Sequence, residues 1–151
     1  MKTDAHLDAR ITVSAVIERD GRFLTVVELD HGREVFSQPS GHLEYNESLL
    51  AGIEREVLEE TGHTCRPLAV IGLYLLTRPG RSTILRVCFH CEVDGTSNGP
   101  LDPEILRTHW LTAEELRAAA QRGPLVSRCL NDYLAGHRYP LSLVDHLVLG
   151  A

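Results

Sequence analysis

The chain has 151 residues, 43% of them hydrophobic and 24% charged, which is enough for one packed domain over residues 1–151. Its net charge is −6 and only 5% of its residues are aromatic, so it lacks the basic surface that nucleic acid binding needs. The first ten residues contain no apolar signal core and no stretch is long enough to span a membrane, so we expect a cytoplasmic protein without membrane partners.

Alternating apolar residues predict three extended segments before residue 40. They cover residues 11–18, 23–29 and 33–38. Asp20-Gly21 and His31-Gly32 are turn dipeptides between them. The third segment leads into a predicted loop at Pro39-Ser40-Gly41.

A helix of about four turns is predicted after this loop. Asn46 is a suitable N-cap residue, and Glu47 would then lie near the positive end of the helix dipole. Gly62 supplies the left-handed residue that ends many helices. Gly52 lies inside the helix, as either a tolerated imperfection or a close approach to the preceding loop.

The predicted helix carries three carboxylates on one edge. Glu56, Glu59 and Glu60 are spaced i, i+3 and i+4, where like charges repel and destabilise the helix. A divalent cation would reverse this repulsion, and Mg²⁺ prefers carboxylate oxygens together with substrate phosphates. Arg55 is the only cation on the helix and is not expected to interrupt the acidic edge. The pattern therefore favours a metal site over a solvated acidic face.

The second half of the chain adds strands and two helices. The strands are predicted at 68–76, 83–93 and 109–111. The first helix is predicted to begin at 112–115, and the second covers 125–134. Arg78-Pro79-Gly80 is a hairpin turn between the first two strands. Thr112 is a predicted N-cap with Glu115 at the reciprocal capping-box position.

The four cysteines are expected to be buried thiols. Cys88 and Cys91 have the spacing of half a zinc site, but a strand directs them to opposite faces. Cys65 and Cys129 do not form the second pair that a tetrahedral zinc site would need.

Residues 41–63 resemble the Nudix box, G-x5-E-x7-R-E-U-x-E-E-x-G-U, in which U is a bulky aliphatic residue. The box positions that match are Gly41, Glu47, Arg55, Glu56, Val57, Glu59, Glu60 and Gly62. His63 departs from the last position, which bears on packing more than on chemistry. The resemblance implies an α/β fold, a Nudix-type α/β/α sandwich with a mixed β-sheet between helices.

The resemblance also implies hydrolysis of a phosphoanhydride bond in a small phosphorylated substrate. The implied cofactor is Mg²⁺, with Mn²⁺ as a substitute. Its implied ligands are the Gly41 carbonyl and the carboxylates of Glu56, Glu59 and Glu60. Metal ions at such a site neutralise phosphate charge and align the attacking and leaving oxygens.

Three further residues of the implied site are assigned by position. Arg55 and Glu47 are expected to hold the carboxylate edge in place through charge-assisted hydrogen bonds. The general base is either a helix acid, such as Glu59, or an acid in the loop before a late strand. In that loop Glu104 is the candidate and Asp102 its competitor.

Arginines are the candidates for binding the substrate. Arg33, Arg78, Arg81 and Arg86 lie on or beside segments that face the predicted cleft. Each guanidinium could bind a terminal phosphate bidentately, and a solvated surface position is the alternative for each one.

Residues 8–145 further resemble the bacterial NudJ-type phosphatases of this family. Residues 11–13, 38–44 and 124–141 carry this similarity, with Ser40 replacing the second glycine of the commoner Pro-Gly-Gly loop. The resemblance implies hydrolysis of nucleoside tri- and diphosphates and thiamin-type pyrophosphates, with release of terminal phosphate. A pyrophosphatase for ADP-ribose or another nucleoside diphosphate derivative is one alternative. A non-catalytic nucleotide-binding module is the other, and the oligomeric state is open.

Overall fold

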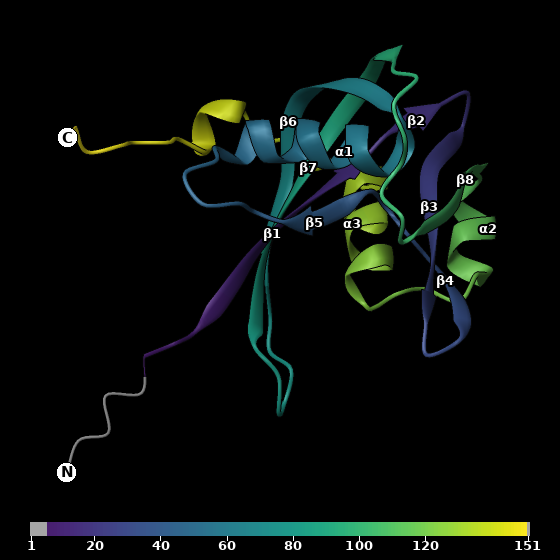
Figure 1. The fold of residues 1–151 in the computed structure, drawn as a ribbon, viewed down its shortest axis with the longest axis horizontal. Coiled ribbons are helices and arrows are strands. Elements are labelled where there is room, and N and C mark those ends of the chain that lie inside the picture. The colour runs from purple at the N-terminus through teal and green to yellow at the C-terminus, as the bar shows by residue number, and fades with distance from the viewer. Residues whose placement is uncertain (1–5, 151) are drawn as a thin grey trace.

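The computed structural model describes residues 6–150 (Figure 1). Its elements are β1 (Ala9–Val16), β2 (Glu18–Arg19), β3 (Arg22–Asp30), β4 (Arg33–Ser37), β5 (Ser40–His42), α1 (Leu49–Thr61), β6 (His63–Leu76), β7 (Thr83–Thr96), β8 (Ile105–Leu111), α2 (Ala113–Ala118), α3 (Leu125–Leu134) and the short 3-10 helix η1 (Leu141–Leu143). Within the described residues, no helix has the length and apolar character needed to cross a membrane.

The strands form two sheets of four. The first has the order β5-β1-β7-β6, with β1 and β7 parallel and the other pairs antiparallel. In the second, β3 pairs with β2, β4 and β8, always antiparallel. The predicted mixed sheet is therefore confirmed as the first sheet, while the strands of the second sheet pair separately.

Helices α1 and α3 cover opposite faces of the mixed sheet. Ile53 and Val57 of α1 belong to one buried hydrophobic cluster, together with Phe89 of β7. Val126 and Leu130 of α3 belong to a second cluster, on the other side of the same strands. This division follows from the strand period of two, because neighbouring side chains point to opposite faces. The α/β/α arrangement predicted from the sequence is confirmed.

The cysteines follow the same alternation. Cys88 lies in the α3-side cluster and Cys91 in the α1-side cluster, so the two thiols cannot share a metal ion. All four cysteines are buried and free of disulfides, as expected. Cys129 shares the α3-side cluster with Cys88, and Cys65 shares the α1-side cluster with Cys91.

The start of α1 differs from the prediction. Ser48, not Asn46, is the N-cap residue, and its hydroxyl accepts a hydrogen bond from the Ala51 N–H at 3.1 Å. Asn46 has φ of 60° and forms part of the preceding turn, because asparagine tolerates the left-handed conformation. Gly62 ends the helix as predicted, with φ of 74° and its N–H bonded to Leu58.

Two other segments are more regular than predicted. Ser40 and Gly41 belong to strand β5, which pairs with β1 and so satisfies backbone groups beside the core. The short strand expected at 109–111 extends over the whole of β8. Thr112 caps α2 as predicted, but the Glu115 carboxylate pairs with Arg22 at 3.4 Å.

Candidate active site

Two glycines allow the loop before α1 to lie directly against the helix. A Cβ atom on Gly52 would lie 2.8 Å from Leu43 Cδ1 and 3.0 Å from Glu47 Oε1. One on Gly41 would lie 2.1 Å from Glu56 Oε1. All three distances are shorter than ordinary van der Waals contact, most of all the one at Gly41, so only glycine fits without a shift of these side chains. Gly52 is thus a close approach, and the Glu56 carboxylate lies against the Gly41 backbone.

Arg55 connects the acidic side chains of this helix. Its Nε donates to Glu47 Oε2 at 2.6 Å and its Nη2 to Glu47 Oε1 at 2.9 Å, which makes a bidentate pair. Its Nη1 donates to Glu56 Oε1 at 2.9 Å and to Glu59 Oε2 at 3.1 Å. Nη2 also donates to the His42 carbonyl at 3.1 Å. The expected hydrogen bonds are present, but the guanidinium lies among the carboxylates, contrary to the prediction of an uninterrupted edge.

The carboxylates differ in electrostatic environment. The hydrogen bond from Arg55 lowers the pKa of Glu47. Burial raises the pKa of Glu56, although Arg55 opposes the shift. Burial raises the pKa of Glu60 to about 9, even though its Oε1 accepts a hydrogen bond from the Ser40 N–H at 2.7 Å. Two carboxylates thus lie where their negative charge is incompletely compensated by protein groups.

The acidic edge has the donor chemistry of a hard divalent cation. Its side-chain donors are all carboxylate oxygens, the type that Mg²⁺ and Mn²⁺ prefer. Among the described residues, however, no three His, Cys, Asp or Glu side chains converge as a ready-made metal site. Arg55 holds Glu56 and Glu59, while Glu60 is bonded to the backbone of Ser40. The residues fit such an ion in type, and their side chains would have to rearrange to bind it.

A loop before β8 is fastened to the C-terminal end of α1. The Asp102 N–H donates to the Glu59 carbonyl at 2.8 Å, and the Asp102 carboxylate accepts from the Glu104 N–H at 3.0 Å. Burial is the main cause of the raised pKa of Glu56, and the negative charge of Asp102 makes a smaller contribution in the same direction. Glu104 is exposed and lines a cavity together with Arg78, Arg81 and Arg122. Of the two loop acids, Asp102 thus lies at the end of α1, and Glu104 faces this cavity.

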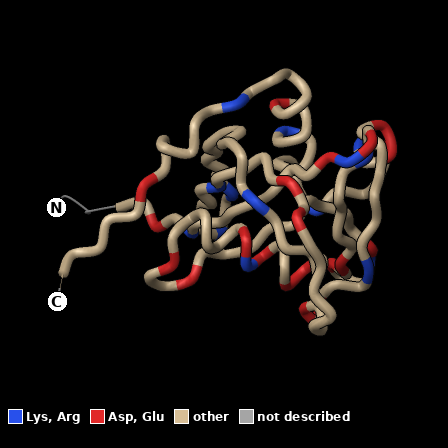
Figure 2. The backbone as a smooth tube through the Cα atoms, turned by 90° about the horizontal axis from the view of Figure 1, so that it is seen from above, with Lys and Arg blue, Asp and Glu red and all other residues tan. Residues whose placement is uncertain are grey.

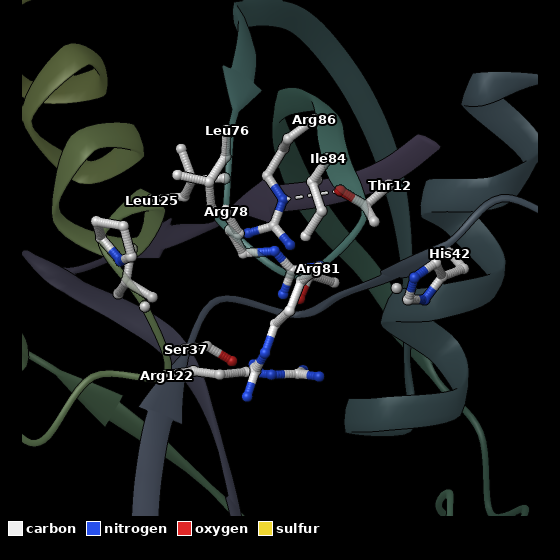
Figure 3. Close-up of a pocket in the computed structure, with 15 residues that line it drawn as sticks. Thr12, Ser37, His42, Leu76, Arg78, Arg81, Ile84, Arg86, Arg122 and Leu125 are labelled. Atoms are coloured by element: carbon white, nitrogen blue, oxygen red, sulfur yellow. Dashed lines mark hydrogen bonds between the residues drawn. The ribbon is translucent and has the colours of Figure 1, made fainter. Parts of the chain in front are cut away.

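Two cavities share part of their lining and are the candidates for holding a substrate. The first, of about 260 Å³, begins at Gly41 and has no carboxylate among its lining residues. Its charged lining residues are Arg78, Arg81, Arg86 and Arg122, whose guanidinium groups point toward the same space (Figure 3). The second cavity, of about 540 Å³, shares three of these arginines and also contains Glu28, Asp30 and Glu104. Along the rest of the trace, basic and acidic positions are interleaved (Figure 2).

The structure brings most of the predicted arginines together. Arg86 lines the first cavity, whereas Arg78 and Arg81 line both. Arg78 also donates to the Ser82 carbonyl of its own turn. Arg86 is largely enclosed, which lowers its pKa, and its Nε donates to Thr12 Oγ1 at 3.1 Å. Arg33 begins β4 beside a tight turn and is not among the lining residues of either cavity.

Arg122 and Glu28 also belong to this region, although no sequence pattern indicates them. Arg122 Nη1 lies 3.3 Å from Glu28 Oε1, and both side chains line the second cavity. The pair joins segments that are far apart in the chain. Hydrogen bonds between the backbone of Phe36 in β4 and that of Ala120 and Arg122 bring these segments together. Gly123-Pro124 marks a loop at this place, but no local pattern indicates a site there.

Comparisons with known proteins identify the family of the chain. The NUDIX domain model matches residues 8–129. The chain is 36% identical over 136 residues to "Phosphatase NudJ" from Escherichia coli, covering 89% of each chain. A NUDIX hydrolase from Nitrosomonas europaea is 40% identical, with a TM-score of 0.88 over 92% of this chain and 97% of that one. An ADP-ribose pyrophosphatase from Streptococcus suis, 17% identical with a TM-score of 0.66 over 86% and 95% of the two chains, shares the fold. The chain therefore belongs to the Nudix family and is a hydrolase of phosphoanhydride bonds.

Proposed function

We propose that the chain is a Mg²⁺-dependent phosphatase of nucleoside tri- and diphosphates and of thiamin-type pyrophosphates, and that it releases terminal phosphate. The observation that carries this proposal is the first cavity, which has four arginines and no acid in its lining. It begins at Gly41, against which the Glu56 carboxylate lies. A chain of phosphates is the small anion whose charge matches such a surface.

The acidic edge would hold the metal. Its ligands would be the carboxylates of Glu56, Glu59 and Glu60 with the Gly41 carbonyl, and Mg²⁺ there would neutralise phosphate charge and acidify the attacking water. Arg55 holds two of these carboxylates by hydrogen bonds and so limits the rotamers that they adopt. This positioning is the first contribution of the chain's own residues to the reaction.

Arginines and a loop acid would complete the site. Arg81 and Arg86 would bind phosphate oxygens and orient the anhydride bond toward the acidic edge. Glu104 and Asp102 are the loop candidates for accepting a proton from water, because their loop is bonded to the end of α1. Arg33 is not included, since it lines neither cavity.

The size of the first cavity supports small substrates. Its volume of about 260 Å³ is at or below the lower end of the range of about 300–1,000 Å³ typical for ligand pockets. Its lining also includes the aliphatic side chains of Leu76, Ile84, Leu125 and Val126. A phosphate group with part of one attached ring fits a space of this size better than the adenosine and the ribose that flank the diphosphate of ADP-ribose.

A substrate panel tests the proposal. Release of phosphate is measured from nucleoside tri- and diphosphates and from thiamin pyrophosphate, and release of AMP is measured from ADP-ribose by chromatography, each with Mg²⁺ and with a chelator. We expect Mg²⁺-dependent phosphate from the first three substrates without a coupling enzyme. Phosphate that appears only after adding a pyrophosphatase would mean internal cleavage and contradict the proposal. Turnover of ADP-ribose alone would favour the alternative hydrolase, and binding without any turnover would favour a non-catalytic module.

A further inference from the structure

Arg122 lies on the wall that the two cavities share, and the roles assigned above do not use it. It lines both cavities together with Arg78 and Arg81. In Figure 3 its guanidinium lies close to that of Arg81, on the side of the cavity opposite the Arg86 strand. An anion in the first cavity would therefore lie between arginines that come from different parts of the chain.

The backbone at Arg122 is firmly placed. The Phe36 N–H donates to the Ala120 carbonyl at 2.8 Å, and the Arg122 N–H donates to the Phe36 carbonyl at 3.0 Å. The neighbouring Gln121 side chain donates to the Leu116 carbonyl at 3.1 Å and bonds to a hydroxyl of α3. The loop between α2 and α3 is thus held to β4 and to both helices, so Arg122 enters the cavity from a fixed position.

The ion pair of Arg122 is weak in geometry. A single contact of 3.3 Å joins it to Glu28, the Arg122 side chain is 49% exposed, and that of Glu28 is 12% exposed. Arg122 is half exposed and held by this single contact, so its guanidinium can turn toward an anion in the cavity, although the enclosed Glu28 would then lose this partner. By contrast, Arg78 and Arg86 form no ion pair with any described carboxylate and donate to a carbonyl and a hydroxyl. Positive charge is therefore in excess here, and Glu28 balances only part of it.

We propose that Arg122 is a specificity residue that leaves Glu28 and binds the terminal phosphate of the substrate. The proposal rests on the proposed function and adds the group that selects a terminal phosphate. A terminal phosphate offers three oxygens and about two negative charges, so it competes well against one oxygen of Glu28. The diphosphate of ADP-ribose is esterified at both ends and offers no such group. Arg122 thus favours substrates that end in phosphate.

The kinetic test compares two substrates in one variant. In Arg122→Gln we expect KM for a nucleoside diphosphate to rise about ten- to hundredfold with kcat little changed, as for the loss of a charged hydrogen bond. The residual kcat/KM for ADP-ribose should stay within about twofold. Arg122→Lys should recover part of the KM because it keeps the charge without the planar fork. Arg117→Gln is the matched control, since Arg117 bonds to Asn131 and lines neither cavity.

A binding test separates this proposal from the proposed function. Calorimetric titration with inorganic pyrophosphate in metal-free buffer should show weaker binding to Arg122→Gln than to wild type by a similar factor. Glu28→Gln should bind severalfold more tightly, because it frees Arg122. No binding by wild type, or equal affinity of wild type and Arg122→Gln, overturns the role of Arg122. A wild type that binds pyrophosphate in this pattern but hydrolyses nothing overturns only the proposed reaction.

Discussion

The two charged walls of the site are organised in opposite ways. On α1, one guanidinium, that of Arg55, makes hydrogen bonds to Glu47, Glu56 and Glu59 within a partly buried network. Across the first cavity, four guanidinium groups line a space without a carboxylate, and among the described residues their one ion pair is the loose contact of Arg122. On the first wall, called the balanced wall below, each of these carboxylates is hydrogen-bonded to a cation of the protein, although the carboxylates outnumber it and would rearrange to bind a metal ion. The second has unbalanced charge, which is the condition for binding a mobile anion.

The largest expected effect comes from the proposed metal ligand on the balanced wall. Glu59→Gln should lower kcat about a thousandfold, or about 4 kcal/mol in the activation barrier, because an amide is a poor ligand for Mg²⁺. The fold should remain intact, since Glu59 is exposed. Steady-state kinetics with thermal denaturation measures both quantities.

Glu54→Gln is the matched control for this change. Glu54 is an exposed glutamate on the same helix and belongs neither to the Arg55 network nor to the acidic edge. Its variant should keep wild-type rates. Rates near normal in Glu59→Gln would remove the catalytic assignment of the acidic edge.

The balanced wall should also matter for stability. Arg55→Met should lower the free energy of unfolding by about 2–3 kcal/mol, because it leaves partly buried carboxylates without their cation. Urea denaturation measures this loss, provided that the unfolding free energies of wild type and variant depend on urea concentration with the same slope. A change below about 1 kcal/mol would show that the network contributes little to folding, and the contrast between the two walls would disappear.

A smaller effect is expected where the loop meets the helix. In Gly41→Ala the new methyl group would overlap the Glu56 carboxylate, the flexible end of its side chain, which should move away. We expect kcat to fall about tenfold, or about 1.4 kcal/mol, with little change in melting temperature. Gly99→Ala is the control, because a Cβ there meets only Ser97 Oγ at 3.5 Å. Unchanged kcat in Gly41→Ala would mean that the position of Glu56 is not critical.

The smallest effect is expected for the free energy of unfolding when an arginine of the second wall is replaced. Arg86→Met should change the free energy of unfolding by less than about 1 kcal/mol, because the lost bond to Thr12 is offset by removing an enclosed, unpaired charge. Affinity for inorganic pyrophosphate should nevertheless fall. A destabilisation as large as that of Arg55→Met would show that Arg86 is balanced by contacts after all, and would erase the distinction between the walls.

The two walls also differ in how well the sequence predicts them. All the acidic residues and their glycine lie within residues 41–62, so the spacing of one helix and one loop determines their arrangement. Arg81, Arg86 and Arg122 come from a hairpin, a strand and a distant loop, and only long-range backbone pairing brings them together. The residues next to Arg122 in the sequence show no pattern that predicts this pairing, which is why Arg122 could not be identified from the sequence.

The local errors have physical causes as well. Helical spacing places Arg55 beside the acidic edge, but it does not say that a long side chain extends back among the carboxylates. Asn46 is a good cap by type, yet it also tolerates a left-handed turn, and the turn prevails. Hydrophobic alternation predicted most strands correctly, while their division between two sheets depends on partners that alternation does not specify.

Strand β7 contributes alternate side chains to both hydrophobic clusters and also carries Arg86. Phe89 faces the α1 side and Cys88 the α3 side, so neither half of the core has a strand of its own here. Heating should consequently melt the two layers in a single cooperative transition. A cavity-forming substitution in the core under α3, remote from the acidic helix, would then lower the stability of the active enzyme as much as one under α1.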